Sequence, residues 1–327
     1  MARIGIDMLN VEKGDAYVIE LYDDTDKKFV VVIDGGTSEK GEILVDHLKK
    51  YNNSKVNLAI CSHPDTDHIG GLITMFQNCD VEQLILNDPQ DIILKDKLLE
   101  TARNNLSKDQ VETFKSSLER IDDLKKEASN QYTTHYNLFS NINPILIFGG
   151  WSIYILSPSE ELFKDIWLNE DVVKNWFNSD SIDISSVLNL AKFVDLDDPT
   201  IDTQPVNNSS LVILIEGYGK KYLFTGDAGK RALRDACNLK DISNLTWFDV
   251  PHHGSRRNVD NKLIAHFAPE TAYISSPGTT KHPRRTVIKA LQKTGAKVFS
   301  TCKQGGMHHN YNLQREGSHY VDPWEIL

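Results

Sequence analysis

The feature that most constrains the fold of this chain is a polar segment, Cys-Ser-His-Pro-Asp-Thr-Asp-His-Ile-Gly-Gly at residues 61–71, which directly follows the apolar run Val56–Ile60. It carries four potential metal ligands within six residues, namely His63, Asp65, Asp67 and His68. A buried strand followed by a ligand-rich loop holds a metal at the edge of a sheet. In an extended loop the first three of these side chains point one way and the fourth points the other. We therefore predict two groups of ligands and a pair of metal ions, rather than a helix cap, which needs only one Asp or Ser.

Two more groups of potential ligands follow predicted strands in the second half of the chain. Asp227 comes after a glycine at the end of the strand predicted at 221–225. A carboxylate there can bridge two cations about 3.5–4 Å apart, because each oxygen binds one of them; the alternative is a helix N-cap. The adjacent His252 and His253 point in different directions in a loop, so we predict that one binds metal and the other orients a group or donates a proton. We favour His252 as the ligand and His253 as the catalytic residue.

Basic residues cluster near these motifs, in the stretch Lys281-His282-Pro283-Arg284-Arg285. We predict that His282 acts in catalysis, either as a further metal ligand or as a contact to the substrate. Arg284 and Arg285 begin a predicted helix, where the backbone N–H groups and the helix dipole also attract an anion. Bases in the first turn of a helix are locally unfavourable, and such a cost often accompanies a functional site. Together with Arg256, this cluster predicts a phosphate site; the alternative is ordinary solvated charge.

The motifs resemble those of the metallo-β-lactamase superfamily. Its usual signature has a histidine where this chain has Asp65, and the variant with Asp resembles the soluble nuclease-like domain of the bacterial competence DNA-uptake protein ComEC and its free-standing relatives. The rest of the resemblance lies in five segments that follow in the family's order: residues 8–16 (Met-Leu-Asn-Val-Glu-Lys-Gly-Asp-Ala), 32–36 (Val-Ile-Asp-Gly-Gly), 207–210 (Asn-Asn-Ser-Ser), 224–227 (Phe-Thr-Gly-Asp) and 250–255 (Val-Pro-His-His-Gly-Ser).

This resemblance implies a four-layer αββα sandwich and a centre with two divalent metal ions. His63 and Asp65 would hold one ion, Asp67 and His68 the other, and Asp227 would join them around a bridging hydroxide. Replacing the usual histidine with Asp65 shifts the ligands toward oxygen, so the metal is expected to be Mn²⁺ or Zn²⁺. The resemblance also suggests that Asn208 or Ser210 touches or braces the site, and we expect Asp34 to support the metal loop without binding the metal.

The length allows one large α/β domain or two small ones. The resemblance implies a single domain over residues 1–327, with a helical insertion at 88–140 and an acidic insertion at 159–204. In the helical segment 91–130, apolar residues recur at steps of three and four, which is typical of an amphipathic helix. We expect this stripe to pack on its own domain as a helical hairpin; the alternative is a surface for a protein partner or a second copy. His135 is expected to face solvent, and His308 and His309 to form a flexible surface pair.

The net charge of −10 is unevenly distributed. Residues 159–204 hold eleven acids and three bases, whereas residues 207–327 hold seventeen bases and ten acids. The half with the later motifs is therefore basic, and an anionic substrate is compatible with it. The sequence has no apolar stretch of the roughly 20 residues that span a bilayer and no secretory pattern. Its four cysteines have no CxxC spacing, so we expect a reduced, cytoplasmic setting without a membrane partner.

Together these patterns predict a metal-dependent hydrolase, with a phosphodiesterase or nuclease as the leading hypothesis. Its substrate would be a nucleic acid or a nucleotide, and the bases that balance the phosphate charge would be Arg256, Lys281, Arg284 and Arg285. An alternative keeps the metals and changes the substrate to a lactone, thioester or lactam, which needs an apolar acyl pocket. A further alternative is a partner-binding component of a defence-type system that acts through the helical or the acidic insertion.

Overall fold

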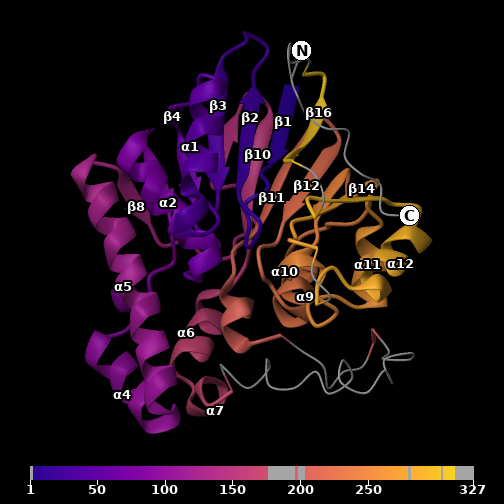
Figure 1. The fold of residues 1–327 in the computed structure, drawn as a ribbon. Coiled ribbons are helices and arrows are strands. Elements are labelled where there is room, and N and C mark those ends of the chain that lie inside the picture. The colour runs from indigo at the N-terminus through magenta and orange to yellow at the C-terminus, as the bar shows by residue number, and fades with distance from the viewer. Residues whose placement is uncertain (1–2, 176–195, 198–202, 279–280, 303–304, 314–327) are drawn as a thin grey trace.

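The structure is a computed structural model, which describes residues 3–175, 196–197, 203–278, 281–302 and 305–313. Within these residues two seven-stranded sheets stand face to face in the middle of the molecule, and helices cover the outer side of each (Figure 1). This is the αββα sandwich that the resemblance implies. The apolar residues on the inner faces of both sheets form one shared core, because alternate residues of each strand point to the same side.

The first sheet is built mainly from the N-terminal third of the chain. Its strand order is β16-β1-β2-β3-β5-β7-β8, with antiparallel pairs from β16 to β3 and parallel pairs from β3 to β8. Parallel strands that are covered on both faces are apolar throughout, as the buried Leu58–Ile60 shows. The strands are β1 (Arg3–Met8), β2 (Tyr17–Tyr22), β3 (Lys28–Ile33), β5 (Leu58–Ile60), β7 (Gln83–Ile85), β8 (Thr134–Tyr136) and β16 (Met307–Tyr311), beside a small two-stranded sheet of β4 (Lys55–Val56) and β6 (Asp80–Val81).

The second sheet repeats this plan with the C-terminal half of the chain. Its order is β15-β14-β13-β12-β11-β10-β9, antiparallel from β9 to β12 and parallel from β12 to β15. Strands β9 and β10 form an antiparallel hairpin with Gly149 and Gly150 at its turn. The strands are β9 (Leu146–Phe148), β10 (Trp151–Ser157), β11 (Val212–Gly217), β12 (Lys220–Phe224), β13 (Trp247–Asp249), β14 (Thr271–Ile274) and β15 (Lys297–Ser300).

Helices form the two outer layers and a separate lobe at one end. In Figure 1, α1, α2 and α5 lie outside the first sheet, α9, α11 and α12 lie outside the second, and α4, α6 and α7 form the lobe below. The helices of the first half are α1 (Gly41–Lys50), α2 (Thr66–Asn78), α3 (Pro89–Ile92), α4 (Lys95–Asn105), α5 (Lys108–Asn130), α6 (Glu160–Leu168) and α7 (Glu170–Val173). Those of the second half are α9 (Lys230–Leu239), α10 (Pro251–Gly254), α11 (Asn261–Phe267) and α12 (Arg285–Lys293), and the 3₁₀ helices are η1 (Ser38–Lys40) and η4 (Pro205–Ser209).

The apolar stripe of α5 is buried inside the chain. Ile121 and Leu124 pack in the core beneath α2, and Phe114 and Leu118 pack against α4 and α6. The expectation that the stripe packs on its own domain is therefore confirmed, and the stripe is not available as a docking surface. The acidic segment at 159–204 begins with α6 and α7, but most of it lies outside the described residues.

Three local expectations are wrong. The ligand segment is not extended throughout: helix α2 begins at Thr66, so the segment is extended only as far as Asp65. His308 lies in strand β16, where its Nδ1 donates to Asp7 over 2.6 Å, so it is not part of a flexible surface pair. His135 lies half-buried in β8, and its Nε2 donates to the carbonyl of Leu86 over 2.7 Å. Both histidines are held by backbone pairing between segments that are far apart in sequence, which local polarity does not reveal.

Of the helices in the described parts of the chain, none combines the length and the apolar character that crossing a bilayer requires.

Candidate metal centre

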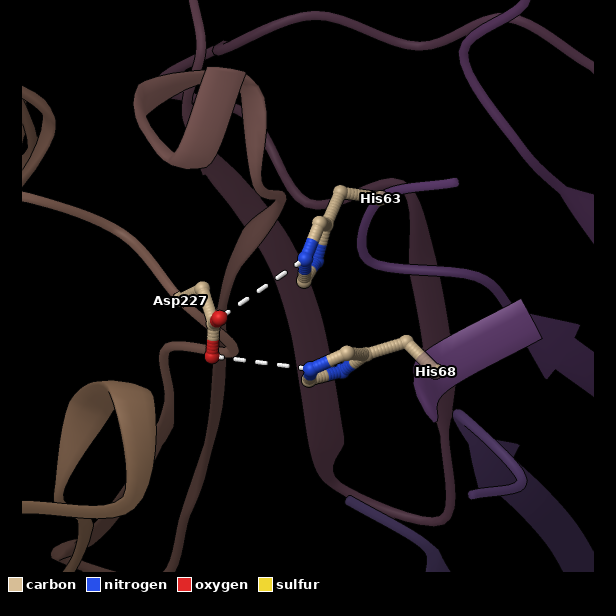
Figure 2. Close-up of side chains that lie close together, drawn as sticks. All are labelled: His63, His68 and Asp227. Atoms are coloured by element: carbon tan, nitrogen blue, oxygen red, sulfur yellow. Dashed lines mark ion pairs between the residues drawn. The ribbon is translucent and has the colours of Figure 1, made fainter. Parts of the chain in front are cut away.

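The candidate centre lies where the carboxyl ends of β5, β12 and β13 meet. The loop after β5 carries His63, the turn after β12 carries Asp227, and the turn after β13 carries His252 and His253. Figure 2 shows His63 and His68 on one side and Asp227 opposite them, each histidine facing a different carboxylate oxygen. The architecture thus brings together ligand motifs from both halves of the chain, one from each sheet.

Asp227 is the point at which the two halves meet. Its Oδ2 lies 3.8 Å from His63 Nε2, and its Oδ1 lies 3.5 Å from His68 Nε2. Its Oδ2 is also 3.8 Å from His252 Nε2. Burial alone would raise the pKa of this carboxyl, but the neighbouring histidines, His252 first, outweigh it and lower the pKa to about 2. The carboxylate is therefore ionised over the whole neutral range and is placed to reach two cations, one with each oxygen.

Hydrogen bonds fix the proton positions on His63 and His68. His68 donates from Nδ1 to Asp34 over 2.8 Å. Ser62 Oγ donates its one proton to Asp34 over 2.5 Å, so it must accept from Nδ1 of His63, 3.0 Å away. Nδ1 of both rings therefore carries a proton, and Nε2 of both faces Asp227. A ring held in this way binds a metal ion through Nε2.

A metal ligand must have an atom that is not already used in a hydrogen bond within the protein, and three atoms of the centre meet this condition. His63 Nε2, His68 Nε2 and Asp227 Oδ1 are buried and have no hydrogen-bond partner among the described residues. Buried polar atoms of this kind are rare, because leaving them unsatisfied costs free energy. The three residues form one group that could hold an ion, since their ligand atoms all lie within 4.8 Å of one another. The residues present therefore fit a divalent metal.

A second group of potential ligands consists of Asp67, His68 and His253. His253 donates from Nδ1 to the carbonyl of Ser275 over 3.0 Å, and its Nε2 faces Asp67 Oδ2, 3.8 Å away. Burial lowers the pKa of His253, but the contact with Asp67 and the charges of Asp227 and Asp15 outweigh it and raise the pKa to about 9. An excess of carboxylates around buried histidines is the electrostatic setting that a divalent cation balances.

The backbone at the two adjacent histidines is left-handed. His252 has φ 50° and His253 φ 56°, which is uncommon for residues other than glycine. The ring planes stand at 87° to each other, with Nε2 of His252 near Asp227 and Nε2 of His253 near Asp67. The expectation that adjacent histidines point in different directions therefore agrees with the structure. The strain at both positions is typical of functional sites.

The structure distinguishes His252 from His253 by their neighbours. The side-chain amide nitrogen of Asn207 lies 2.9 Å from Nδ1 of His252 and donates to it, which leaves the proton of the ring on Nε2. His253, by contrast, donates from Nδ1 to a backbone carbonyl. The two rings therefore differ in the partner of Nδ1, and which of them binds a metal stays a prediction.

Asp65 and Asp34 lie on either side of His63. Asp65 is the extended residue before α2, and its Oδ2 is 3.6 Å from His63 Nε2. Asp34 accepts from the backbone N–H of Ser62 over 2.7 Å, in addition to the bonds given above. Asp34 also belongs to a third group of possible ligands, with Asp15 and His68. Its carboxylate oxygens, however, already accept hydrogen bonds from Ser62 and His68. It therefore braces the metal loop, as expected.

The polar side chains of the segment 207–210 have different surroundings. Asn208 accepts from the backbone N–H groups of Gly229 and Ala232 at the start of α9. Ser210 is fully buried, and its hydroxyl has no hydrogen-bond partner within the described residues. It is Asn207, which the sequence motif includes but does not single out, that reaches His252.

A small basic pocket adjoins the centre. It has a cavity volume of about 40 Å³ and is lined by His252, Ser255, Arg256, Arg257, Lys281, His282 and Arg284. Burial and the positive charges nearby lower the pKa of His282 to about 3, so the ring is neutral at neutral pH. The structure thus brings together three of the four predicted phosphate-binding bases. Arg285, the fourth, is exposed on α12 and does not line this pocket.

Two residues near the centre were missed by sequence reasoning. Asp15 is buried with its Oδ1 3.8 Å from His253 Nδ1, and burial followed by the charge of Asp249 raises its pKa to about 8. It lies within the quoted motif at 8–16, so a signal for it was present. Arg120, on α5, donates to the carbonyl of Pro64 over 3.2 Å in the metal loop. No local pattern distinguishes Arg120 from the other charged residues of that helix.

The two facing sheets with helices outside them, and the buried His and Asp groups suited to a divalent metal, agree with the metallo-β-lactamase fold. In agreement, residues 9–125 match the family model described as the metallo-beta-lactamase superfamily. This match includes β2, β3, β5 and the whole ligand segment that follows them.

More particularly, the chain is 31% identical over 124 residues to ComE operon protein 3 of Bacillus subtilis (strain 168). The aligned part is 37% of this chain and only 16% of that protein. Among solved structures, the chain is similar to zinc-bound PqqB from Methylobacterium extorquens, with a TM-score of 0.43, 9% identity and coverage of 90% and 87% of the two chains. It is also similar to a metallo-β-lactamase from Cronobacter sakazakii, with a TM-score of 0.36, 7% identity and coverage of 74% and 72%. The fold assignment rests on the sheet topology and the sequence match, since both TM-scores are low.

Proposed function

We propose that this protein is a phosphodiesterase that uses two divalent metal ions and acts on a nucleic acid or a nucleotide. The observation that carries the proposal is the basic pocket beside the centre. Four of its lining residues are Arg or Lys, none is acidic, and it shares His252 with the surroundings of Asp227. An acyl ester, thioester or lactam needs an apolar pocket at this place, whereas the oxygens of a phosphodiester need cations.

The residues fit two metal positions that share Asp227. His63 and Asp65 would hold one ion with Asp227, and Asp67, His68 and His253 would hold the other. When bound, a pair of such ions lowers the pKa of water and stabilises negative charge that develops on the reacting phosphate. The resemblance to the nuclease-like domain of ComEC supports the same substrate class. Mn²⁺ and Zn²⁺ both suit a mixed set of imidazole and carboxylate ligands.

The side chains around the centre have separate tasks. Arg256, Lys281 and Arg284 bind and orient the non-bridging oxygens of the phosphate, since a guanidinium can give two parallel hydrogen bonds. His252 lies at the boundary between the basic pocket and Asp227. In its doubly protonated, imidazolium form it donates the Nε2 proton to the departing oxygen and is left as a neutral ring. His282, neutral in its buried position, contacts the substrate through hydrogen bonds rather than through charge.

The first test combines metal content with hydrolysis of bis(p-nitrophenyl) phosphate in the presence of Mn²⁺ or Zn²⁺. We expect two ions per chain and a metal-dependent release of p-nitrophenol that is lost in Asp67→Ala. Asp46→Ala, which removes an exposed carboxylate on α1, is the control. Full metal-dependent hydrolysis by Asp67→Ala would contradict the proposal, and hydrolysis of acyl esters alone would point to the other substrate class.

A pair of neighbouring arginines tests the pocket. Arg284→Ala removes a lining residue, whereas Arg285→Ala removes the same charge from the exposed surface beside it. We expect KM for the phosphodiester to rise about tenfold or more in Arg284→Ala and to change less than about twofold in Arg285→Ala, with metal content unchanged in both. Equal effects of the two substitutions would mean that long-range charge, and not the pocket, attracts the substrate.

A further inference from the structure

We infer that a second pocket, beneath helix α5, binds the nucleoside part of the phosphodiester substrate and that Arg120 is its recognition residue. This inference rests on the proposed function and adds the part of the substrate that lies beyond the reacting phosphate. Its basis is a cavity of about 220 Å³ that opens beside two candidate metal ligands, Asp65 and Asp67. The cavity lies outside the basic pocket, and the two share no lining residue.

The walls of this pocket come from segments far apart in sequence. Asp65 and Asp67 form the side toward the centre, and α5 supplies Thr113, Ser117 and Arg120 across from them. Carbon-rich surface is added by Phe114 and Val206, both almost fully buried. The volume exceeds the share of one water molecule, about 30 Å³, several times over. A planar ring with polar edges fits such a mixture of apolar wall and hydrogen-bonding groups.

Arg120 is held firmly at the edge of the pocket. Its Nε donates to the carbonyl of Pro64 over 3.2 Å, and its Nη2 donates to Ser117 Oγ over 2.9 Å. These bonds use part of the guanidinium, and its remaining N–H groups are donors available to a ligand. A side chain that is already oriented loses little conformational entropy when it binds. The carbonyl oxygens of a nucleobase, or the hydroxyls of a sugar, are acceptors for it.

Charge separates the two pockets. The basic pocket has several cations and no carboxylate, so it suits a phosphate group. The pocket beneath α5 has one cation, Arg120, facing Asp65 and Asp67, whose charges stabilise the guanidinium. One cation suits a neutral group with acceptor atoms better than a second phosphate, which the four cations of the basic pocket can neutralise. With the candidate metal ligands lying between the pockets, the phosphate end points toward α12 and the nucleoside end toward α5.

The experiment compares two esters with the same leaving group: thymidine 5′-(p-nitrophenyl phosphate), which carries a nucleoside, and bis(p-nitrophenyl) phosphate, which does not. The measured quantity is the ratio of kcat/KM for the first to that for the second. We expect Arg120→Ala to lower this ratio about tenfold. Thr113→Phe, which places a ring in the pocket from an exposed position on α5, should lower the ratio by a similar factor.

The controls are Lys126→Ala and Asp123→Phe, which make the same kinds of change at exposed positions of α5 that do not line the pocket. Both should keep the wild-type ratio. An unchanged ratio in Arg120→Ala and Thr113→Phe overturns the inference. A fall for both esters together with a loss of bound metal also overturns it, because Arg120 would then act by holding the metal loop. If the wild-type protein cleaves bis(p-nitrophenyl) phosphate with no preference for the thymidine ester, the inference fails and the proposed function stands. If it cleaves neither ester, both fail.

Discussion

At the scale of single residues, the centre depends on backbone conformations that few residues adopt readily. Asp34, His252 and His253 all have positive φ angles, each of which costs about 1–3 kcal/mol. Neighbouring contacts hold them in place: the N–H of Asp34 donates to Ile60, and the N–H of His252 donates to Gly226. The free energy lost in the backbone is thus offset by contacts to the strands, and the side chains are fixed before any ligand arrives.

Gly14 allows the closest approach of backbone to the metal loop. A Cβ at this position would lie 1.5 Å from the carbonyl oxygen of Asp67, and φ is +83°. We expect Gly14→Ala to displace Asp67 and to abolish binding of the metal ion that Asp67 holds, measured by metal analysis of the purified protein. Gly219→Ala is the control, since Gly219 has φ +74° and nothing near its Cβ. If both substitutions leave the metal content unchanged, the close approach is not essential.

Asp34 orients both His63 and His68 without binding the metal itself. Removing such a support typically weakens metal binding by about 10–100-fold. Asp34→Ala should therefore raise the dissociation constant for Zn²⁺ by a factor in that range, measured by competition with a chelating dye. Asp46→Ala, on the exposed face of α1, should leave it unchanged. Total loss of metal in Asp34→Ala would instead indicate that Asp34 is itself a ligand.

His252 is proposed to protonate the departing oxygen, and the acidity of the leaving group tests this role. A p-nitrophenolate leaves without a proton, whereas the sugar hydroxyl of a dinucleotide does not. We expect His252→Ala to slow dinucleotide cleavage by about 10²–10⁴-fold and cleavage of bis(p-nitrophenyl) phosphate by a much smaller factor. His266→Ala, at an exposed position, should change neither rate. Equal losses for both substrates would show that His252 serves as a metal ligand.

The sequence predicts site residues well where chemistry and strand ends coincide. His63, Asp65, Asp67, His68 and Asp227 stand out because ligand residue types directly follow apolar strands, and the structure brings them together. Asn207 and Arg120 could not be predicted in the same way. Each reaches the centre only through the packing of distant elements, and neither polar side chain is unusual at its own position.

At the scale of elements, α5 connects the helical lobe to the centre. Its N-terminal half packs against α4 and α6, and its C-terminal half packs on α2. Between the two halves, Arg120 contacts the metal loop. The long apolar period made this helix predictable, because a stripe that recurs every three to four residues has one buried face. The start of α2 at Thr66 was not predictable from periodicity, because Thr66–His68 are all polar and show no apolar face. Asp65 is the N-cap residue of this helix.

A capping box fixes the start of α5. The backbone N–H of Gln110 donates to Ser107 Oγ over 3.4 Å, and the N–H of Ser107 donates to Gln110 Oε1 over 3.0 Å. Ser107→Ala should lower the free energy of unfolding by about 1 kcal/mol, measured by urea denaturation with an unchanged m-value. Ser129→Ala, at an exposed position near the other end of the helix, should change it by less than about 0.5 kcal/mol. Similar effects of the two would mean that the box does not stabilise the helix.

At the scale of the whole molecule, the two sheets are joined through their shared core and through β16. This strand follows the whole second sheet in the chain, yet it pairs with β1 at the edge of the first. It was missed in the sequence because Met-His-His-Asn-Tyr is too polar to predict a strand, and its partner lies at the opposite end of the chain. By contrast, the strands predicted within 56–60 and at 221–225 correspond to β5 and β12, whose apolar residues are buried.

The packing of His309, on β16 of the first sheet, against the second sheet makes the stability of the fold depend on pH. Its ring packs beside Tyr222 of β12 and Tyr273 of β14, with centroids 5.9 and 6.2 Å away. Burial first, and then the charges of His308 and Lys220, lower its pKa to about 4, against 6.5 for an exposed histidine. The folded state therefore binds this proton less readily than the unfolded state does. Its contribution to stability is complete above pH 6.5 and is lost as the pH falls from 6.5 to about 4.

His309→Phe keeps an aromatic ring at this place and removes the titration. Between pH 7 and pH 4, we expect the wild-type free energy of unfolding to fall by about 3 kcal/mol more than that of the variant, because 2.5 units of pKa correspond to that energy. Urea denaturation at a series of pH values measures the difference between the two curves. His266→Phe, on the exposed face of α11, should follow the wild-type curve. If the curve of His309→Phe also runs parallel to that of the wild type, the ring of His309 is not the acid-sensitive contact between the sheets, and the fall in stability must arise from the carboxylates of the centre.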